Sequence, residues 1–145
     1  MKFLVLNGPN LNLLGLREPD IYGIDSIKDI KIWLNSQIEL DDYEIIWFQS
    51  NHEGDLIDQI HAAINEFDGL IINPGALTHY SYALRDAISA IPIPVIEVHL
   101  SAINQREEFR KISVIKNVCI GQISGKGKAG YFEALKTLVN HIENS

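Results

Sequence analysis

Short apolar runs alternate with segments of helical periodicity along this chain. The apolar runs are rich in Val, Ile, Leu and aromatic residues, which is typical of strands. Four of them are almost continuously apolar, as expected for a parallel sheet that is covered on both faces. The predicted strands are residues 3–6, 45–48, 70–72, 95–98 and 118–123. Between them, apolar residues recur every three or four positions. This spacing predicts helices near 26–39, 54–66, 80–90 and 131–142, and a short helix near 104–111.

The order of these elements predicts an α/β fold. Repeated strand–helix alternation is typical of a three-layer, doubly wound parallel sheet of five strands with right-handed crossovers. The expected strand order is the flavodoxin-like 2-1-3-4-5. The length of 145 residues fits one domain, residues 1–145. The first helix is expected to begin with Asp25 or Ser26 as its cap. Its apolar stripe would consist of Ile27, Ile30, Leu34 and Ile38.

Composition narrows the classes of function. The net charge of −7, with no run of Lys or Arg, disfavours binding to nucleic acid phosphates. An anionic substrate would have to be met by a few local cations and backbone N–H groups. The one cysteine, Cys119, permits no intrachain disulfide and favours a reducing, cytoplasmic location, with Cys119 itself as a small buried hydrophobe. No apolar run approaches the roughly 18 residues of a membrane span, and the run at 3–6 ends too early for a signal peptide.

Polar and titratable residues gather after the predicted strands. In open α/β sheets, ligands bind beyond the carboxyl ends of the strands. The stretch 8–24 is also long for a strand-to-helix loop, and loops of that length in compact domains are usually functional. These positions are therefore the candidates for a binding site.

Five motifs in these segments carry a resemblance to a known family. They are N-G-P-N-L-N-x-L-G-x-R-E-P-x-x-Y-G at 7–23, Q-S-N-H-E-G at 49–54, I-N-P-G-A-x-T-H-x-S-x-A-L-R-D-A at 72–87, E-V-H-L-S at 97–101 and R-E-E-F-R at 106–110. In order and spacing, they are similar to the type II 3-dehydroquinate dehydratases, and the match covers nearly the whole chain.

The resemblance implies a specific reaction. It is the elimination of water from 3-dehydroquinate to give 3-dehydroshikimate through an enolate, a hydro-lyase step of the shikimate pathway of aromatic amino acid biosynthesis. No cofactor is expected, because the ketone of the substrate itself delocalises the developing charge. The resemblance also implies a homododecamer built from trimers. The alternatives are a non-catalytic flavodoxin-like module that binds a small anion, and an inactive relative that only assembles.

The resemblance places the base on Tyr22 and the acid on His99. A free phenol is only about 0.1% ionised at pH 7, so the base needs a nearby cation. Arg17, five residues earlier, matches the residue implicated in that role; at about 4 Å its charge would favour the phenolate by roughly 4 kcal/mol. Glu97 lies two residues before His99 on a strand, so both side chains share a face and the carboxylate favours a protonated imidazole. On local grounds alone, a packed loop tyrosine and a core histidine–glutamate pair remain open alternatives.

Other positions match residues that contact the substrate in the family. Asn10 resembles the residue that stabilises the enolate oxygen through an ordered water, although a turn-forming asparagine fits the same position. His79 is also consistent with a helix cap, and Arg106 with either a lid contact or a surface charge. The remaining substrate-contacting positions that the resemblance implies are Asn73 and Arg110, with the backbone N–H groups of Leu100 and Ser101 as the seat of the substrate carboxylate.

Asp86 lies on a helix that meets a neighbouring subunit in the family, where this aspartate reaches the neighbour's site; an exposed helix charge is the local alternative. The chain departs from the family at Ala102, Asn104 and Lys111-Ile112, which puts the packing around the acid in doubt.

A formal G-x-G-x-x-G at 125–130 is interpreted as a tight turn, because too little chain follows it for a dinucleotide-binding unit. The histidines show no metal-binding spacing.

Overall fold

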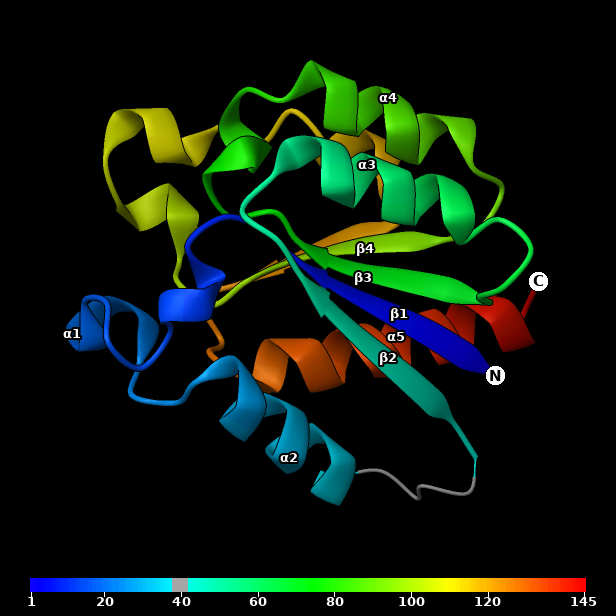
Figure 1. Ribbon diagram of the computed structural model, residues 1–145, viewed down its shortest axis with the longest axis horizontal. Coiled ribbons are helices and arrows are strands. Elements are labelled where there is room, and N and C mark those ends of the chain that lie inside the picture. Colours follow the sequence, from blue (N-terminus) through cyan, green and yellow to red (C-terminus); the bar gives the residue numbers. More distant parts are fainter. Residues whose placement is uncertain (38–41) are drawn as a thin grey trace.

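The computed structural model describes residues 1–37 and 42–145 and has the predicted three-layer α/β architecture (Figure 1). The central sheet is entirely parallel, and its order, β2-β1-β3-β4-β5, confirms the predicted 2-1-3-4-5. Its strands are β1 (Lys2–Asn7), β2 (Glu44–Gln49), β3 (Gly69–Asn73), β4 (Val95–His99) and β5 (Gly121–Ser124).

Two pairs of helices cover the two faces of the sheet (Figure 1). One pair is α2 (Ile27–Gln37) with α5 (Ala129–Glu143); the other is α3 (Glu53–Ala62) with α4 (Tyr82–Ala90). Among the described residues, no helix is long and apolar enough to span a membrane.

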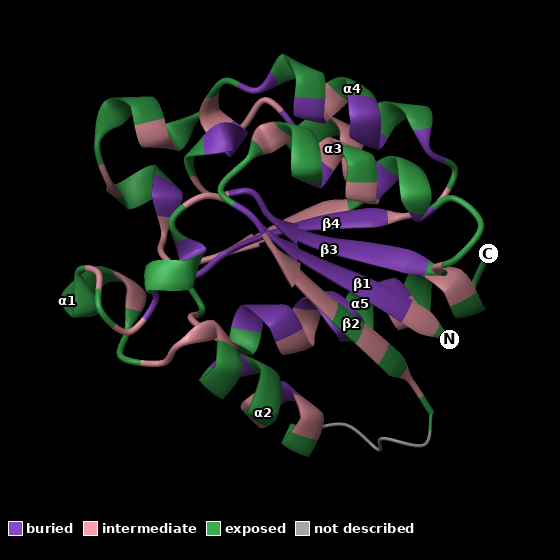
Figure 2. Cartoon of the chain, viewed as in Figure 1, coloured by how far each residue is buried: buried purple, intermediate pink, exposed green. Residues whose placement is uncertain are grey.

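The alternation of side chains along the strands divides the core in two. In β1, Phe3 and Val5 pack toward α2 and α5, whereas Leu4 and Leu6 pack toward α3 and α4. β1, β3 and β4 are the most deeply buried strands (Figure 2). Cys119 packs half-buried against the α3/α4 side, where burial, together with the charge of Glu97, raises the pKa of its thiol to about 12.

Helix starts follow local capping chemistry. Ser26 begins α2, because its hydroxyl accepts from the Asp29 N–H at 3.1 Å while the Asp29 carboxylate accepts from the Ser26 N–H at 3.0 Å. Ile38, which the periodicity assigned to this helix, lies outside the described residues. α4 begins at Tyr82, since the hydroxyl of Ser81 accepts from the Leu84 N–H at 3.0 Å. The cap interpretation of His79 is therefore wrong.

Two predicted elements differ in form. The helix expected near 104–111 is two short 3-10 helices, η3 (Ile103–Gln105) and η4 (Glu108–Lys111), separated by an extended backbone at Arg106 and Glu107. The strand expected from residue 118 begins at Gly121, because η5 (Lys116–Val118) occupies the start of the predicted range. The Ser113 hydroxyl accepts from the Lys116 N–H at the start of η5, at 3.1 Å. The long loop 8–24 holds two more short helices, η1 (Leu11–Leu13) and α1 (Pro19–Tyr22).

Candidate active site

A cavity opens at the carboxyl ends of β1, β3 and β4, the edge at which the sequence predicted a site. Its walls come from the loop after β1, the start of η2 (Gly75–His79), the end of β4 and the η3–η4 segment. Three arginines and two histidines line it, and none of the described Asp or Glu residues does. This lining suits an anionic ligand. The lining residues are Pro9, Asn10, Leu11, Arg17, Tyr22, Asn73, Gly75, Ala76, His79, His99, Leu100, Ser101, Ile103, Arg106 and Arg110.

Two guanidinium groups contact Tyr22. Arg106 Nη1 donates to the phenol oxygen at 2.6 Å, and its guanidinium carbon lies 5.0 Å from the ring centroid. The guanidinium carbon of Arg17 lies over the same ring at 4.7 Å from its centroid, and Arg17 also pairs with Glu18 at 3.7 Å. The sequence singled out Arg17 and left Arg106 as a loose candidate. In the structure, Arg106 is the residue at the phenol oxygen.

Glu97 and His99 form a buried pair at the end of β4. They are only 0% and 5% exposed, and His99 Nε2 lies 2.5 Å from Glu97 Oε2. The predicted placement of both side chains on one face of the strand is confirmed. Nε2 faces the carboxylate, so Nδ1 is the ring nitrogen that remains for a ligand in the cavity.

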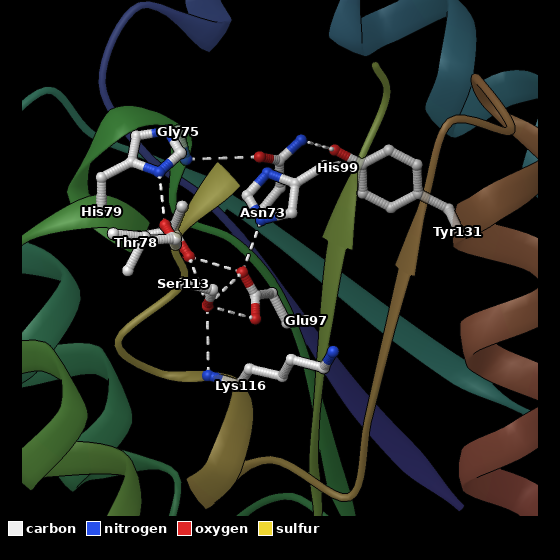
Figure 3. A network of polar contacts seen from close by, with 10 residues as sticks. Asn73, Gly75, Thr78, His79, Glu97, His99, Ser113, Lys116 and Tyr131 are labelled. Atoms are coloured by element: carbon white, nitrogen blue, oxygen red, sulfur yellow. Dashed lines mark hydrogen bonds and ion pairs between the residues drawn. The ribbon is translucent and has the colours of Figure 1, made fainter. Parts of the chain in front are cut away.

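The pKa of Glu97 reflects opposing influences. Burial is the largest single influence and raises the pKa. Hydrogen bonding to His99, the charge of His99, and hydrogen bonds from Thr78 and Ser113 lower it, and the net direction is below the ordinary value of a glutamate. The carboxyl group is therefore held as an anion inside the protein (Figure 3).

His79 faces the cavity as a neutral imidazole. Its Nδ1 donates to the backbone oxygen of Ile112 at 2.7 Å, which leaves the lone pair of Nε2 free to accept. Burial is the main cause that lowers the pKa of His79, and the charges of His99 and Arg110 add to it. The ring of Phe109 packs edge-on against the imidazole.

Asn73 is held by a buried hydrogen-bond chain that starts in α5. Tyr131 donates to Asn7 Oδ1 at 2.6 Å. It also accepts from Asn73 Nδ2 at 3.1 Å, and Asn73 Oδ1 accepts from the Gly75 N–H at 3.3 Å (Figure 3). Burial raises the pKa of Tyr131, so the phenol stays neutral.

Asn10 forms the turn after β1 and also lines the cavity. Its backbone is left-handed, with φ of 70°, and its N–H donates to the Asn51 side chain at 2.9 Å, so it forms the turn. Its side chain makes no cap hydrogen bond to η1 and lines the cavity. The amide is therefore available to a ligand.

The glycine loop at 125–130 supports the end of β4. Gly127 N–H donates to the Leu100 oxygen and Gly125 N–H to the Ser101 oxygen, both at 3.1 Å. In a trans peptide, N–H points opposite to C=O. The Ser101 N–H is thus turned away from the glycine loop, toward the cavity that Ser101 lines. The glycines have φ of 77° and 55°, which glycine adopts readily, and the loop is the predicted strand-to-helix turn.

Some residues at the site escaped the sequence reasoning, and one predicted member lies outside it. Thr78 and Ser113 contact Glu97 but have no separate signal in the sequence. Arg110 lines the cavity and pairs with Glu107 at 2.5 Å. Asp86 is exposed on α4 and is absent from the cavity lining. Within the described part of the chain, no cluster of three His, Cys, Asp or Glu side chains is arranged to hold a metal ion.

Comparison with known proteins identifies the family. The profile of the family described as dehydroquinase class II matches residues 1–139. The chain belongs to this family. A protein named 3-dehydroquinate dehydratase from Bacillus licheniformis is 57% identical over 137 residues, covering 94% of each chain. One of the same name from Bacillus subtilis is 53% identical over 138 residues, covering 95% of this chain and 93% of the relative. The crystal structure of a type II dehydroquinase from Butyrivibrio crossotus superimposes with a TM-score of 0.92 at 51% identity, covering 96% of this chain and 97% of the other.

Segments of this chain that are far apart in sequence meet at the cavity. Tyr22 and Arg106, both in the lining, are 84 positions apart and are in hydrogen-bond contact. Asn7 and Tyr131, which are 124 positions apart, are also hydrogen-bonded, and Tyr131 in turn holds Asn73 in the lining. The parallel sheet explains this, since it brings the carboxyl ends of β1, β3 and β4 to a common edge.

Proposed function

We propose that this chain is a 3-dehydroquinate dehydratase, a hydro-lyase that converts 3-dehydroquinate to 3-dehydroshikimate in the shikimate pathway of aromatic amino acid biosynthesis. One observation carries the proposal: a single cationic cavity holds a phenol in contact with guanidinium groups and an imidazole in contact with a buried carboxylate. The elimination needs such a base and such an acid. One catalytic domain, residues 1–145, performs the reaction.

Tyr22 acts as the base. As a phenolate it removes the proton next to the ketone, and the electron pair of the broken C–H bond moves into the carbonyl to form the enolate. The Arg106 donor at the phenol oxygen and the Arg17 charge over the ring stabilise the phenolate. Asn10 supplies a neutral donor for the enolate oxygen through a water molecule, which stabilises the charge without trapping it as an ion pair would.

His99 acts as the acid. The enolate collapses, the C–O bond to the neighbouring carbon breaks, and His99 protonates the departing hydroxyl so that water leaves. Glu97 stabilises the imidazolium form that donates this proton. The proton taken by Tyr22 and the proton lost by His99 return to solvent equilibrium after product release.

The remaining cavity residues orient the substrate. The backbone N–H groups of Leu100 and Ser101 hold its carboxylate, and the glycine loop keeps the Ser101 peptide in that direction. The lone pair of His79 accepts from a substrate hydroxyl. Asn73 and Arg110 complete the contacts.

Tyr22→Phe tests the assignment of the base. The phenylalanine keeps the ring between its guanidinium partners but has no oxygen to take a proton. We expect kcat to fall by at least about 100-fold, in line with the loss of a positioned general base. The measurement is the ultraviolet absorbance of the conjugated enone-carboxylate product formed from 3-dehydroquinate, with the native fold checked by circular dichroism. A variant with nearly unchanged kcat would show that another group is the base.

The same assay distinguishes the proposed enzyme from the alternative, a non-catalytic module that binds small anions. It predicts saturable binding of 3-dehydroquinate without any product absorbance. An inactive assembly protein predicts neither binding nor turnover.

The assembly belongs to the proposal as well. A homododecamer built from trimers would cover apolar side chains that this single chain exposes. Tyr80, just before α4, and Tyr82, its first residue, are 62% and 66% exposed. Phe109 in η4 and Ile112, directly after η4, are 57% and 61% exposed. Sedimentation equilibrium should give twelve times the chain mass of 16.3 kDa. A cytoplasmic location, as the single cysteine favours, completes the proposal.

A further inference from the structure

The Glu97 carboxylate accepts hydrogen bonds from side chains of three separate segments. His99 Nε2 on β4 lies 2.5 Å from Oε2. The Ser113 hydroxyl lies 2.8 Å from Oε1 and 2.9 Å from Oε2, and the Thr78 hydroxyl also donates to Oε2. Glu97 is 0% exposed, so water contributes nothing to its solvation. Figure 3 shows the three side chains converging on the carboxylate.

The hydrogens of these groups can all serve the carboxylate. Each hydroxyl carries one hydrogen. The Ser113 oxygen accepts from the Lys116 N–H at 3.1 Å and lies 3.0 Å from the Thr78 hydroxyl, a contact in which either oxygen could donate. When Glu97 is an anion, both hydroxyl hydrogens and the His99 N–H can point at the carboxylate, which then accepts from all three groups. When Glu97 carries a proton, that proton takes the place of one of these donors. The full set of donors therefore stabilises the ionised form.

Both hydroxyl-bearing segments are fixed against each other. The Val114 N–H donates to the Thr78 oxygen at 2.7 Å, and Arg85 Nη1 donates to the Val114 oxygen at 2.6 Å. Both bonds are made by the backbone of Val114, directly after Ser113, and the first one is accepted by Thr78 itself. The hydroxyls are thus placed by the backbone before a substrate arrives, which is the arrangement that lowers the cost of holding a buried charge.

We propose that Thr78 and Ser113 are positioning residues that keep Glu97 ionised and aimed at His99, so that the shared proton resides on the imidazole and not on the carboxylate. This inference rests on the proposed function for its kinetic consequence. Its structural part concerns the free protein: without either hydroxyl, the carboxylate becomes a better proton acceptor and competes with His99 for the proton that the reaction requires.

The first experiment measures Glu97 directly. In protein labelled with ¹³C at the glutamate side-chain carbonyl, the Glu97 signal is assigned by its loss in Glu97→Gln and titrated over the range in which circular dichroism stays native. Thr78→Val, close in shape but without the hydroxyl, and Ser113→Ala should each raise the pKa of Glu97 by about one unit, as expected for the loss of one charged hydrogen bond. Thr78→Ser should restore the wild-type titration. Ser36→Ala, which removes an exposed hydroxyl on α2, is the matched control and should change nothing.

The second experiment asks whether the hydroxyls act through Glu97. Thr78→Val and Ser113→Ala should each lower kcat for 3-dehydroquinate about tenfold while KM stays within about twofold, because one charged hydrogen bond is worth roughly that factor. In a Glu97→Gln background, the same substitutions should cost less than about twofold more. A merely structural role predicts equal losses in both backgrounds.

The outcomes separate the two proposals. If the wild-type protein does not turn over 3-dehydroquinate, the proposed function fails, while the titration of Glu97 still tests the positioning role. If the wild type is active but the Glu97 titration is the same in Thr78→Val and Ser113→Ala as in the wild type, the positioning role is wrong. Equal kcat losses with and without the Glu97 carboxylate would overturn it as well.

Discussion

The phenol of Tyr22 lies between two arginines that do different things. Arg106 donates a short hydrogen bond to the oxygen, and Arg17 places its charge over the ring face. A hydrogen bond from a charged donor is directional and acts on the atom at which negative charge develops, whereas a charge over the ring acts mainly by proximity. The contribution of Arg106 to the reaction should therefore depend on its geometry as well as on its charge.

Substitution of Arg106 separates charge from geometry. Arg106→Gln removes the cation at the phenol oxygen, and kcat should fall by roughly tenfold to a hundredfold, since a hydrogen bond to a charged group is worth about 1.5–3 kcal/mol. Arg106→Lys keeps the charge but loses the planar guanidinium, and an intermediate kcat is expected. Steady-state kinetics at constant pH measures both variants. A glutamine variant with the wild-type kcat would mean that the contact at 2.6 Å has no part in ionising the base.

Rules of local sequence spacing identified some residues of the candidate site and missed others. Glu97 and His99 are two positions apart on a strand, so the period of two predicted their contact, and the structure confirms it. Arg106 lies 84 positions from Tyr22, and Ser113 lies 16 from Glu97 across a turn. No local spacing rule connects such pairs, because the tertiary fold alone brings them together.

The segment that carries Tyr22 is shaped by its ends. Pro19 lies in the first turn of α1, where its fixed φ suits a helix start. Gly23 ends α1 with φ of 85° and ψ of 179°, a conformation that is essentially restricted to glycine. The backbone angle directly after Tyr22 therefore sets where the phenol lies relative to Arg106.

Gly23→Ala tests this link between backbone and site. No atom lies within 4 Å of a Cβ at position 23, so the substitution introduces strain without a clash. Relief of that strain, about 1–3 kcal/mol, should turn the chain after Tyr22 and lower kcat about tenfold or more. The measurements are kcat, KM and the urea midpoint of unfolding.

Gly54→Ala is the matched control for this substitution. Position 54 is equally free of neighbours within 4 Å but lies inside α3, where alanine is favourable. It should keep kcat and unfold at the same or a higher urea concentration. Equal kcat in the two alanine variants would contradict a special role for the backbone at Gly23.

Helices and strands were predictable where the hydrophobic periodicity extended over enough residues. The continuous apolar strands and the four longer helices specified the layers. The sheet order was an expectation from one of the two common orders of doubly wound folds, and the structure confirms it. Of the five 3-10 segments among the described residues, only η3 and η4 were anticipated, as one short helix near 104–111, since each segment has only three to five residues. Such segments offer too few positions for a hydrophobic period to be recognised.

At the scale of the whole molecule, an acidic protein presents a cationic cavity. The net charge is −7, yet the cavity lining contains Arg17, Arg106 and Arg110 without any carboxylate. The sequence indicated that an anionic ligand would need local cations, and the fold supplies them from two distant segments. Two of the proposed site residues, Glu97 and Asp86, are absent from the cavity lining. Glu97 contacts His99 in the lining, whereas Asp86 is exposed on α4, so we expect a role of Asp86 in the reaction to depend on assembly.

Complementation tests whether Asp86 serves the site of a neighbouring subunit. Asp86→Ala and Tyr22→Phe should each be nearly inactive alone while keeping the assembly of the wild type. When the two variants are coexpressed with different tags and purified as mixed assemblies, a site is complete if an Asp86→Ala subunit meets a Tyr22→Phe neighbour. With random mixing in a symmetric assembly, this holds for about one quarter of the sites, so about one quarter of the wild-type kcat should return. If Asp86 acted within its own subunit, every site would lack one of the two groups, and the mixed assemblies would stay inactive.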